Sequence, residues 1–335
     1  MKEMVILHTG GTFAMETHKN GRLGSGVSVV EYIKTHIIPS YQDLKIDQIQ
    51  LFNIDSSLFT PEHWILLAEK IRDIYDDYDG FIIIHGTDTL SYSAAALSFM
   101  LKNLSKPVIF TGSQLPYFEK RSDAFSNLSA SLEVALHGNL NEVAVVFNNS
   151  AYRGNRVKKK DVFDFDAFYS PNFEILIKMG IGLEEHGSLF LPKSDKKLEL
   201  DIRLCRDILI IPFFPGLDFN FYNPVLSHNN LRGILIEAYG NGNIPSDNSG
   251  LDELFSNGSE KKIPIVVCSQ APVGSVNLAI YEAAEKASFY GLISAEDMTL
   301  ETTLVKLMIA LGRYKTLEDI KNFMIKNIAG EKHFN

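Results

Sequence analysis

Two stretches of the chain carry hydroxyl and acidic side chains at the ends of apolar runs. In residues 4–12 a short apolar run leads through two glycines to Thr12, and in residues 81–89 a run of bulky residues leads through one glycine to Thr87 and Asp88. In open α/β sheets, ligands bind where buried strands end. Two such strand ends predict one site between them.

The same residues offer nucleophilic chemistry. A threonine hydroxyl becomes a nucleophile when a base takes its proton or a neighbouring cation stabilises the alkoxide. Asp88 is adjacent to Thr87, and the run Lys158–Lys160 supplies amines. The glycines before Thr12 allow backbone N–H groups to approach a substrate closely, where they can hold a developing oxyanion.

Each of these pieces also has a purely structural interpretation. A Gly-Gly-Thr sequence after a strand is typical of a turn, Asp88 could cap the helix that follows it, and Ser56 and Ser57 could cap another. The run Lys158–Lys160 is typical of a solvated face or a phosphate-binding patch. The catalytic interpretation rests on convergence, because four strand ends of one predicted sheet carry small hydroxyl or acidic residues.

An alternation of strands and helices positions these residues. The predicted strands are 44–54, 81–84, 107–110 and 142–147, and the predicted helices are 29–38, 61–74, 90–104 and 124–137. Thr60 and Pro61 are typical of a helix start, as the N-cap and the first helical residue. This order predicts a parallel sheet covered by helices.

A second α/β set follows a looser stretch. Its predicted strands are 207–211, 233–237 and 263–268, and its predicted helices are 277–287, 300–311 and 317–328. The predicted fold class is therefore α/β with two α/β domains. These are a larger N-terminal parallel-sheet domain (1–190) and a smaller C-terminal Rossmann-like domain (207–335), joined by a linker (191–206).

Composition limits the class of partner. The chain has 335 residues, 45% of them apolar, a formal net charge of −9 and a pI of about 5.5. Folded domains are expected, and binding to nucleic acid or an anionic membrane has no electrostatic driving force. A small polar substrate fits this composition better.

Cysteine and histidine usage points to a cytoplasmic protein without a metal. Cys205 and Cys268 are the only cysteines, too few for a disulfide framework, and the histidines, including His8 and His85, lack metal-ligand spacing. The first apolar run is too short for a signal peptide or a spanning helix. Neither glycine-rich nucleotide-binding pattern follows a predicted strand, which disfavours a nucleotide-binding protein.

The polar, glycine-containing stretch 16–26 predicts a mobile loop near Thr12. It could close as a lid over Thr12 or be an ordinary surface connection, because loops carry both roles.

Taken together, Thr9–Thr12 and His85–Thr89 resemble the two signature motifs of bacterial-type L-asparaginases. The later matching segments are most similar to the cytoplasmic, type I branch. They are 55–57, 111–114, 121–123, 148–149, 152–156 and 165–172. The resemblance is weaker after residue 175, where 239–243 and 269–270 still match.

The resemblance implies catalytic roles. Thr12 is similar to the nucleophile that is acylated by the side-chain amide carbon. Thr87, Asp88 and Lys159 resemble a second triad that polarises the hydroxyl or the hydrolytic water. Lys159 is selected among the three lysines because it keeps the family's spacing to Phe168. No metal or organic cofactor is implied.

The resemblance also implies a substrate and an assembly. The substrate is L-asparagine, with L-glutamine a weaker one, and the assembly is a homodimer or homotetramer. The first three residues of the implied substrate-binding set hold the α-carboxylate, while Asp88 faces the α-ammonium. That set is Asp55, Ser56, Ser57, Gly86, Thr87, Asp88 and Ser113.

The chain departs from the family pattern in the expected lid. The family usually carries a tyrosine about ten residues after the first threonine, where this chain has Gly21-Arg22. A tyrosine hydroxyl can relay a proton, whereas arginine stays charged and only donates. Glu237 and Ala271 also depart from an effector site of some type I members, so allosteric control is not expected.

Three functions follow from these patterns. The leading hypothesis is hydrolysis of L-asparagine to L-aspartate and ammonia through an acyl-threonine intermediate. The runner-up is the amidase subunit of a tRNA-dependent amidotransferase, although such subunits look longer at the N-terminus. A non-catalytic amino-acid-binding homologue is the third, kept open by Arg22.

Overall fold

The structure, a computed structural model, describes residues 1–17, 23–25, 29–41, 43–137, 139–226, 228, 230–245, 248–279 and 284–333. They form two compact units, Met1–Ile202 and Arg203–Asn335. Each unit is built on a sheet of mostly parallel strands with helices, which confirms the predicted α/β class.

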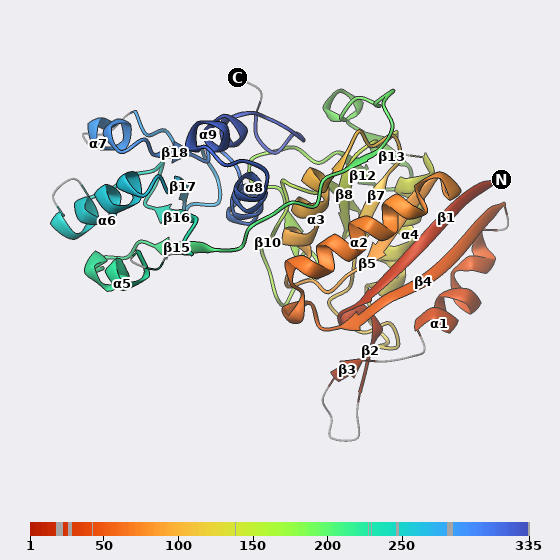
Figure 1. Cartoon of the computed structure of the whole chain (residues 1–335). Coiled ribbons are helices and arrows are strands. Elements are labelled where there is room, and N and C mark those ends of the chain that lie inside the picture. The colour runs from red at the N-terminus through yellow and green to blue at the C-terminus, as the bar shows by residue number, and fades with distance from the viewer. Residues whose placement is uncertain are drawn as a thin grey trace. The chain divides into compact units, whose positions relative to one another are not determined.

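The first unit carries the elements that position the site (Figure 1). Its helices are α1 (Val29–His36), α2 (Pro61–Asp73), α3 (Leu90–Met100) and α4 (Ala124–His137). Its strands are β1 (Lys2–Gly10), β2 (Met15–Thr17), β3 (Leu23–Ser25), β4 (Leu44–Ile54), β5 (Gly80–Ile84), β6 (Leu101–Lys102), β7 (Val108–Thr111), β8 (Val143–Phe147), β9 (Ser150–Arg153), β10 (Lys158–Lys159), β11 (Phe168–Tyr169), β12 (Ile177–Met179), β13 (Leu183–Glu185) and β14 (Glu199–Leu200). Part of the segment predicted as a linker, 191–206, thus contributes β14 to this unit.

The main sheet has the order β13-β12-β9-β8-β7-β5-β1-β4. The strands from β4 to β8 are parallel, as predicted, whereas β9, β12 and β13 extend the sheet with antiparallel pairs. The change of direction follows from Asn148 and Asn149, which join β8 to β9 with φ angles of 45° and 58°. Two consecutive positive φ values favour the tight turn of a hairpin.

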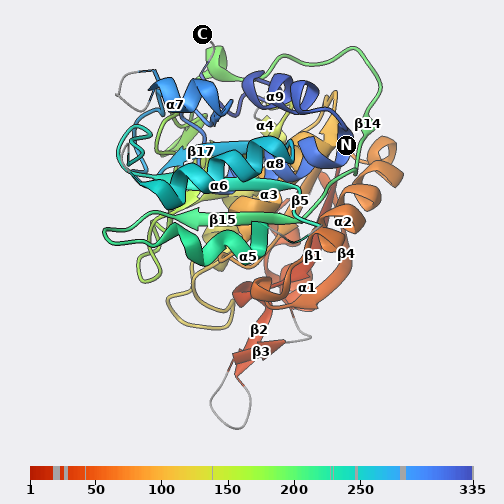
Figure 2. The ribbon, with the colours of Figure 1, turned by 60° about the vertical axis from the view of Figure 1, so that its left-hand side comes forward.

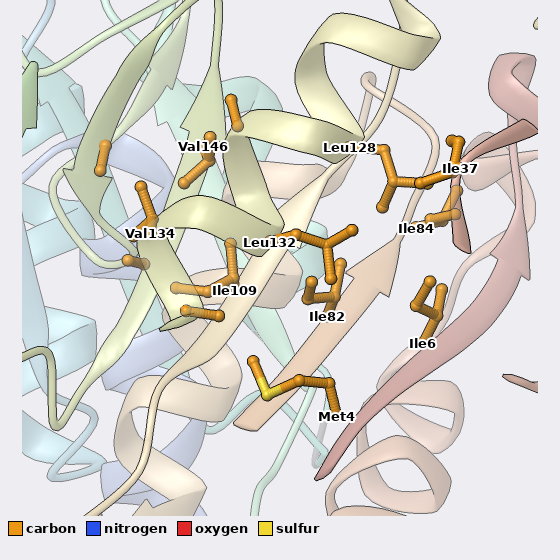
Figure 3. Close-up of a cluster of buried hydrophobic side chains, with 14 of the residues drawn as sticks. Met4, Ile6, Ile37, Ile82, Ile84, Ile109, Leu128, Leu132, Val134 and Val146 are labelled. Atoms are coloured by element: carbon orange, nitrogen blue, oxygen red, sulfur yellow. The ribbon is translucent and has the colours of Figure 1, made fainter. Parts of the chain in front are cut away.

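Helices cover both faces of this sheet. α1 and α4 share one apolar cluster with alternate residues of the central strands, among them Ile82 and Ile84, and Figure 3 shows Leu128 and Leu132 of α4 over these isoleucines. α2 and α3 lie on the other face (Figure 1), where the Trp64 indole N–H donates to the Ser93 hydroxyl at 2.9 Å. The strands are buried on both sides, so they read as continuous apolar runs.

The connection through α4 has the opposite hand to the others. α1 connects β1 to β4 in one direction along the sheet, while α4 connects β7 to β8 in the other direction, yet both lie on the same face. Two crossovers on one face that run in opposite directions have opposite hands. The connections through α2 and α3 run in the same direction as the α4 connection but on the other face, so they share the hand of the α1 connection. Because parallel crossovers are right-handed in about 98% of cases, the α4 connection is the left-handed one.

The chain reverses its order around β1 and β5. From β1 it runs to β4 on one side, and from β5 it runs to β7 on the other. The carboxyl ends of two such neighbouring strands form the crevice in which open α/β sheets bind ligands. Thr12 follows β1 and Thr87 follows β5, so both threonines lie at this switch point.

Glycines allow the strand ends to meet. Gly11 has a φ of +79°, and a Cβ atom on it would lie 2.3 Å from the Cα of Gly86. A Cβ atom on Gly86 would in turn lie 2.5 Å from the Ser56 hydroxyl oxygen. The loops after β1 and β5 therefore touch backbone to backbone, and the Ser56 side chain after β4 fills the space beside Gly86, so neither glycine has room for a side chain.

Three predicted segments differ from the structure. The helix predicted over 277–287 has residues 277–279 in irregular or turn conformation, and a helix spans Ala284–Phe289 instead. The helix predicted over 90–104 ends at Met100, and the next residues form β6, which pairs with β14, a strand about 100 positions later. The stretch 16–26, predicted as a loop, includes β2 and β3, which pair with each other. Gly21 and Arg22 lie outside the described residues.

The second unit is a smaller parallel sheet with helices (Figure 2). Its elements are β15 (Ile208–Pro212), α5 (Asn223–Leu226), β16 (Gly233–Ala238), α6 (Ser249–Glu260), β17 (Ile265–Ser269), α7 (Ala284–Phe289), β18 (Ile293–Ser294), α8 (Leu300–Arg313) and α9 (Leu317–Ile325). The strand order is β15-β16-β17-β18, all parallel. α6 was not predicted, because Gly250 and Gly258 lower its helix propensity.

Two buried histidines lie close to neighbouring strands of the first unit, His8 within β1 and His85 directly after β5. Burial lowers the pKa of His8 to about 4 and that of His85 to about 4, because both imidazoles lose solvent. The Nε2 atom of His8 lies 3.0 Å from the Gln48 side-chain oxygen. Both rings are therefore neutral in the folded protein at pH 7.

No helix among the residues described is long and apolar enough to cross a bilayer.

The contact between the strand ends predicts the effect of a single methyl group. Gly11→Ala should destabilise the fold by about 2 kcal/mol or more, because it combines a positive φ with a clash against the Gly86 backbone. The free energy of unfolding in urea measures this. Gly180→Ala is the matched control, since a Cβ atom there meets nothing within 4 Å. Equal stability of the two variants would contradict the close contact.

The buried imidazole of His8 predicts a loss of stability in mild acid. The unfolded chain protonates His8 near pH 6.5, whereas the folded chain keeps it neutral until about pH 4. Its contribution is therefore complete above pH 6.5 and is lost as the pH falls toward 4. In His8→Gln, which keeps an amide near the Nε2 position, the drop in unfolding free energy between pH 7 and pH 5 should be smaller by about 2 kcal/mol. Parallel pH dependences in urea titrations would refute this.

Candidate active site

A polar cavity of about 220 Å³ lies at the carboxyl ends of β1, β4 and β5. Its volume is below the range of about 300–1,000 Å³ typical of drug-sized ligands, so it suits a small polar molecule. The residues that line it are Gly11, Thr12, Met15, Asp55, Ser56, Gly86, Thr87, Asp88, Gln114, Lys159 and Val162. The two threonines singled out in the sequence therefore share one cavity.

Lys159 connects to the second threonine. Its Nζ atom donates to Thr87 Oγ1 at 2.8 Å and to Asp88 Oδ1 at 2.7 Å. The lysine side chain is 18% exposed and the aspartate side chain 65% exposed, so the ion pair lies at the mouth of the cavity. The three side chains proposed as a triad are thus in direct contact.

Strand alternation explains why Lys159, of the three consecutive lysines, reaches the site. β10 pairs with β11 so that Lys159 stands opposite Phe168, the residue whose spacing selected it. Phe168 is buried against Phe147, which anchors the strand pair. Lys160, the next residue along, turns to Asp166 instead.

The contacts of Thr87 favour an oxyanion at its side chain. An ammonium group that donates to the Thr87 oxygen stabilises negative charge there and directs the hydroxyl proton away from the lysine. The Thr87 hydroxyl then donates to the Gln114 side-chain oxygen, a long contact with 3.5 Å between the two oxygen atoms. The following helix has Thr89 as its N-cap, so Asp88 does not serve as that cap.

Gln114 is a lining residue that the sequence analysis did not select. Its side-chain amide donates to the Asp164 carbonyl at 3.0 Å, and the Asp123 carboxylate accepts its backbone N–H at 3.0 Å. Gln114 therefore joins Thr87 to the loop at Asp164, 50 positions after Gln114. Its position in the polar turn after β7 was a usable signal, because the other strand ends had been selected on the same grounds.

Two apolar residues complete the lining. The Asp161 carboxylate accepts the backbone N–H groups of Phe163 and Asp164 at 2.6 and 2.9 Å, and these donors lower the pKa of Asp161. The turn that they form presents Val162 to the cavity. Val162 and Met15 carried no sequence signal, because an isolated apolar residue in a loop has no functional pattern.

The remaining predicted residues divide into two groups. Ser56 is buried and lines the cavity together with Asp55, whose Oδ1 atom accepts the Ser57 backbone N–H at 2.8 Å. Ser57 itself is exposed, and the Ser113 hydroxyl donates to the Leu115 carbonyl at 2.6 Å. Neither belongs to the cavity lining of the described chain.

The charges of the cavity suit a ligand that carries an ammonium group. Asp55 and Asp88 supply two carboxylates, and Lys159 supplies one ammonium. An amino-acid ammonium would complete the charge balance beside Asp88. Within the described ranges, no cluster of three or more His, Cys, Asp or Glu side chains is placed to hold a metal ion.

Comparisons with known proteins cover both units. The profile of the family described as "Asparaginase, N-terminal" matches residues 3–189, and that of "Glutaminase/Asparaginase C-terminal domain" matches residues 207–324. The chain is 36% identical over 334 residues to the L-asparaginase 1 of Escherichia coli K12, covering 98% of each chain. It is 32% identical to a Glutamyl-tRNA(Gln) amidotransferase subunit of Pyrococcus abyssi, with 99% of this chain and 77% of the relative covered.

Solved structures agree. The thermostable L-asparaginase from Thermococcus kodakarensis superposes with a TM-score of 0.92 at 34% identity, covering 99% of this chain and all of that one. L-asparaginase I from Vibrio cholerae gives a TM-score of 0.90 at 33% identity, with 99% of both chains covered. The resemblance to the type I branch is thereby confirmed. With matching family profiles over most of its length and full-length relatives above 30% identity, the chain belongs to the asparaginase family.

Proposed function

We propose that this protein is an L-asparaginase, which hydrolyses the side-chain amide of L-asparagine to L-aspartate and ammonia. The observation that carries the proposal is the direct contact of Lys159 with Thr87 and Asp88 in a cavity that Thr12 also lines. A hydroxyl nucleophile can form the acyl intermediate of a two-step amide hydrolysis, and a cation-supported second hydroxyl can polarise the water that resolves it.

The proposed reaction has two covalent steps. The Thr12 oxygen attacks the side-chain amide carbon, the threonine proton passes to the leaving nitrogen, and the C–N bond breaks to release ammonia. A water molecule, polarised by the pair of Thr87 and Lys159, then attacks the acyl carbon. The bond to the Thr12 oxygen breaks, the hydroxyl regains its proton and aspartate leaves.

Substrate recognition is proposed from the lining residues. Asp88 pairs with the α-ammonium of asparagine, and the Ser56 hydroxyl donates to the α-carboxylate. Asp55 holds the turn that presents Ser56, because its carboxylate caps the Ser57 N–H. Roles for the Ser57 and Ser113 side chains rest on the family resemblance alone, as does the lid role of Gly21 and Arg22.

Two alternatives have distinct signatures. An amidotransferase subunit, a class represented among the relatives, would copurify with a partner protein and deliver ammonia to it. A non-catalytic binding homologue would show calorimetric binding of asparagine or aspartate without ammonia release. Turnover of free asparagine by the purified chain alone supports the asparaginase proposal over both.

Assembly and location are proposed from the same family. A homodimer or homotetramer in the cytoplasm is what the type I resemblance implies, with a small-molecule substrate and neither nucleic acid nor membrane as partner. Sedimentation analysis of the purified chain tests the assembly.

The two threonines predict two inactive variants. Thr12→Ala removes the nucleophile and Thr87→Val removes the hydroxyl that Lys159 contacts, so each should lower kcat with asparagine on the order of 10³-fold. Coupled detection of ammonia measures the rate, and an unchanged thermal unfolding transition excludes misfolding. Wild-type turnover in either variant would remove the role of that threonine.

The lysine run predicts a contrast between neighbours. Lys159→Met should lower kcat about 100-fold or more, because the charge that supports the Thr87 oxygen is lost. Lys160→Met is the matched control, since this lysine pairs with Asp166 and is not among the residues that line the cavity. Similar losses in both variants would show that a general effect of charge, rather than the contact with Thr87, is responsible.

A further inference from the structure

A series of buried hydrogen bonds connects two helices to the wall of the cavity. The Trp64 indole N–H donates to the Ser93 oxygen at 2.9 Å, and the Ser93 oxygen lies 2.9 Å from His85 Nε2. On the other side of the ring, His85 Nδ1 lies 2.8 Å from the Gly86 carbonyl oxygen. This series of hydrogen bonds begins on α2, passes through α3 and ends at the backbone of the cavity wall.

The chemistry of these groups assigns every proton. A carbonyl oxygen only accepts, so the Nδ1 atom of His85 carries the hydrogen that is donated to Gly86. The Nε2 atom of a neutral imidazole is then an acceptor, and the Ser93 hydroxyl is the donor that satisfies it. The Ser93 oxygen accepts from the Trp64 indole in turn, so each polar atom has a partner of the right kind.

The surroundings hold the ring in this one state. His85 is fully buried, with ring centroids 4.3 Å from Phe59 and 5.8 Å from Phe110. Burial lowers the pKa of His85 to about 4, so the ring is neutral over the ordinary pH range. A flip of the ring would place the carbon atoms Cδ2 and Cε1 where Nδ1 and Nε2 now contact the Gly86 carbonyl and the Ser93 hydroxyl, which costs a buried hydrogen bond at each end.

The Gly86 carbonyl matters because of what shares its peptide unit. In a trans peptide the C=O of one residue and the N–H of the next point in opposite directions. A carbonyl held toward buried His85 therefore directs the Thr87 N–H away from the ring. The orientation of this peptide plane also sets the position of the Thr87 Cα atom, from which the Thr87 side chain and the backbone to Asp88 continue. Gly86 has no side chain to restrict its own dihedral angles, so the restraint has to come from outside.

We propose that His85 is a positioning residue for amide hydrolysis: its Nδ1 hydrogen, oriented by Ser93 and Trp64, fixes the peptide between Gly86 and Thr87 and thereby aligns the Thr87 hydroxyl with Lys159. Neither His85, Ser93 nor Trp64 lines the cavity. This proposal rests on the proposed function only because its effect is measured as kcat for asparagine hydrolysis.

Two substitutions with amide side chains test the roles of the two ring nitrogen atoms of His85 separately. In His85→Asn the amide nitrogen can stand where Nδ1 stands and still donate to Gly86. In His85→Gln the longer side chain places its amide near Nε2, so it reaches Ser93 but leaves the carbonyl without its donor. Both variants remove the ring from between Phe59 and Phe110, so a purely structural role predicts similar losses in both.

The expected result is an asymmetry in kcat. His85→Asn should keep kcat for asparagine within about tenfold of the unmodified protein, whereas His85→Gln should lose about 100-fold, as misplaced catalytic groups do. Both are measured with the full chain at a temperature where thermal unfolding shows them to be folded. Equal kcat in the two variants, or a lower value in His85→Asn, would overturn the proposal.

A second variant tests the relay without touching His85. Ser93→Ala removes the hydroxyl that fixes the ring state and leaves the Trp64 indole N–H without its acceptor. Trp64 is the only tryptophan of the chain, so its emission maximum should shift in Ser93→Ala, and kcat should fall about tenfold while KM changes little. An unshifted emission maximum with unchanged kcat would overturn the relay.

The role of His85 can also be tested if the protein does not hydrolyse asparagine. Absence of turnover in the unmodified chain would refute the proposed function. The positioning of the cavity wall is then read from calorimetric binding of aspartate, which His85→Asn should retain and His85→Gln should weaken. Equal affinities would overturn the role of His85 independently of catalysis.

Discussion

The site depends on one backbone contact, that between Gly11 and Gly86. Parallel strands β1 and β5 lie side by side, and their following loops touch so closely that a Cβ atom on Gly11 would lie 2.3 Å from the Gly86 Cα atom. This contact brings a hydroxyl from each strand end to one small cavity. Every other feature of the site, from the lysine to the buried histidine, acts on groups that this contact has already placed.

The charged side chains give the two threonines of the cavity different surroundings. Lys159 gives its hydrogen bonds to Thr87 and Asp88, so one hydroxyl is supported by positive charge. Thr12 follows two glycines with positive φ angles, a backbone suited to presenting N–H groups. The two threonines are chemically alike, but their surroundings differ, and this difference is the basis for giving them different roles in a two-step hydrolysis.

Local patterns predicted much of the first unit. β4 and α4 have the predicted bounds because their apolar periodicity ends at clear polar signals. The end of α3 was missed, since Leu101 and Lys102 leave the helix only to pair with β14, far along the chain. α6 was missed because its glycines argue against a helix that packing nevertheless stabilises. In each miss a distant partner outweighed local propensity.

The sequence by itself determined which strand ends carry reactive groups, because apolar runs, glycines and hydroxyl residues are local features. The matching motifs also determined the family. Only the tertiary structure decided which groups meet: that Lys159, which the family spacing had selected, donates to Thr87, that Gln114 joins the described lining while Ser57 and Ser113 do not, and that His85 points its nitrogen at the Gly86 carbonyl. The physical reason is that side-chain direction depends on strand register and on packing between elements, which no single stretch of sequence contains.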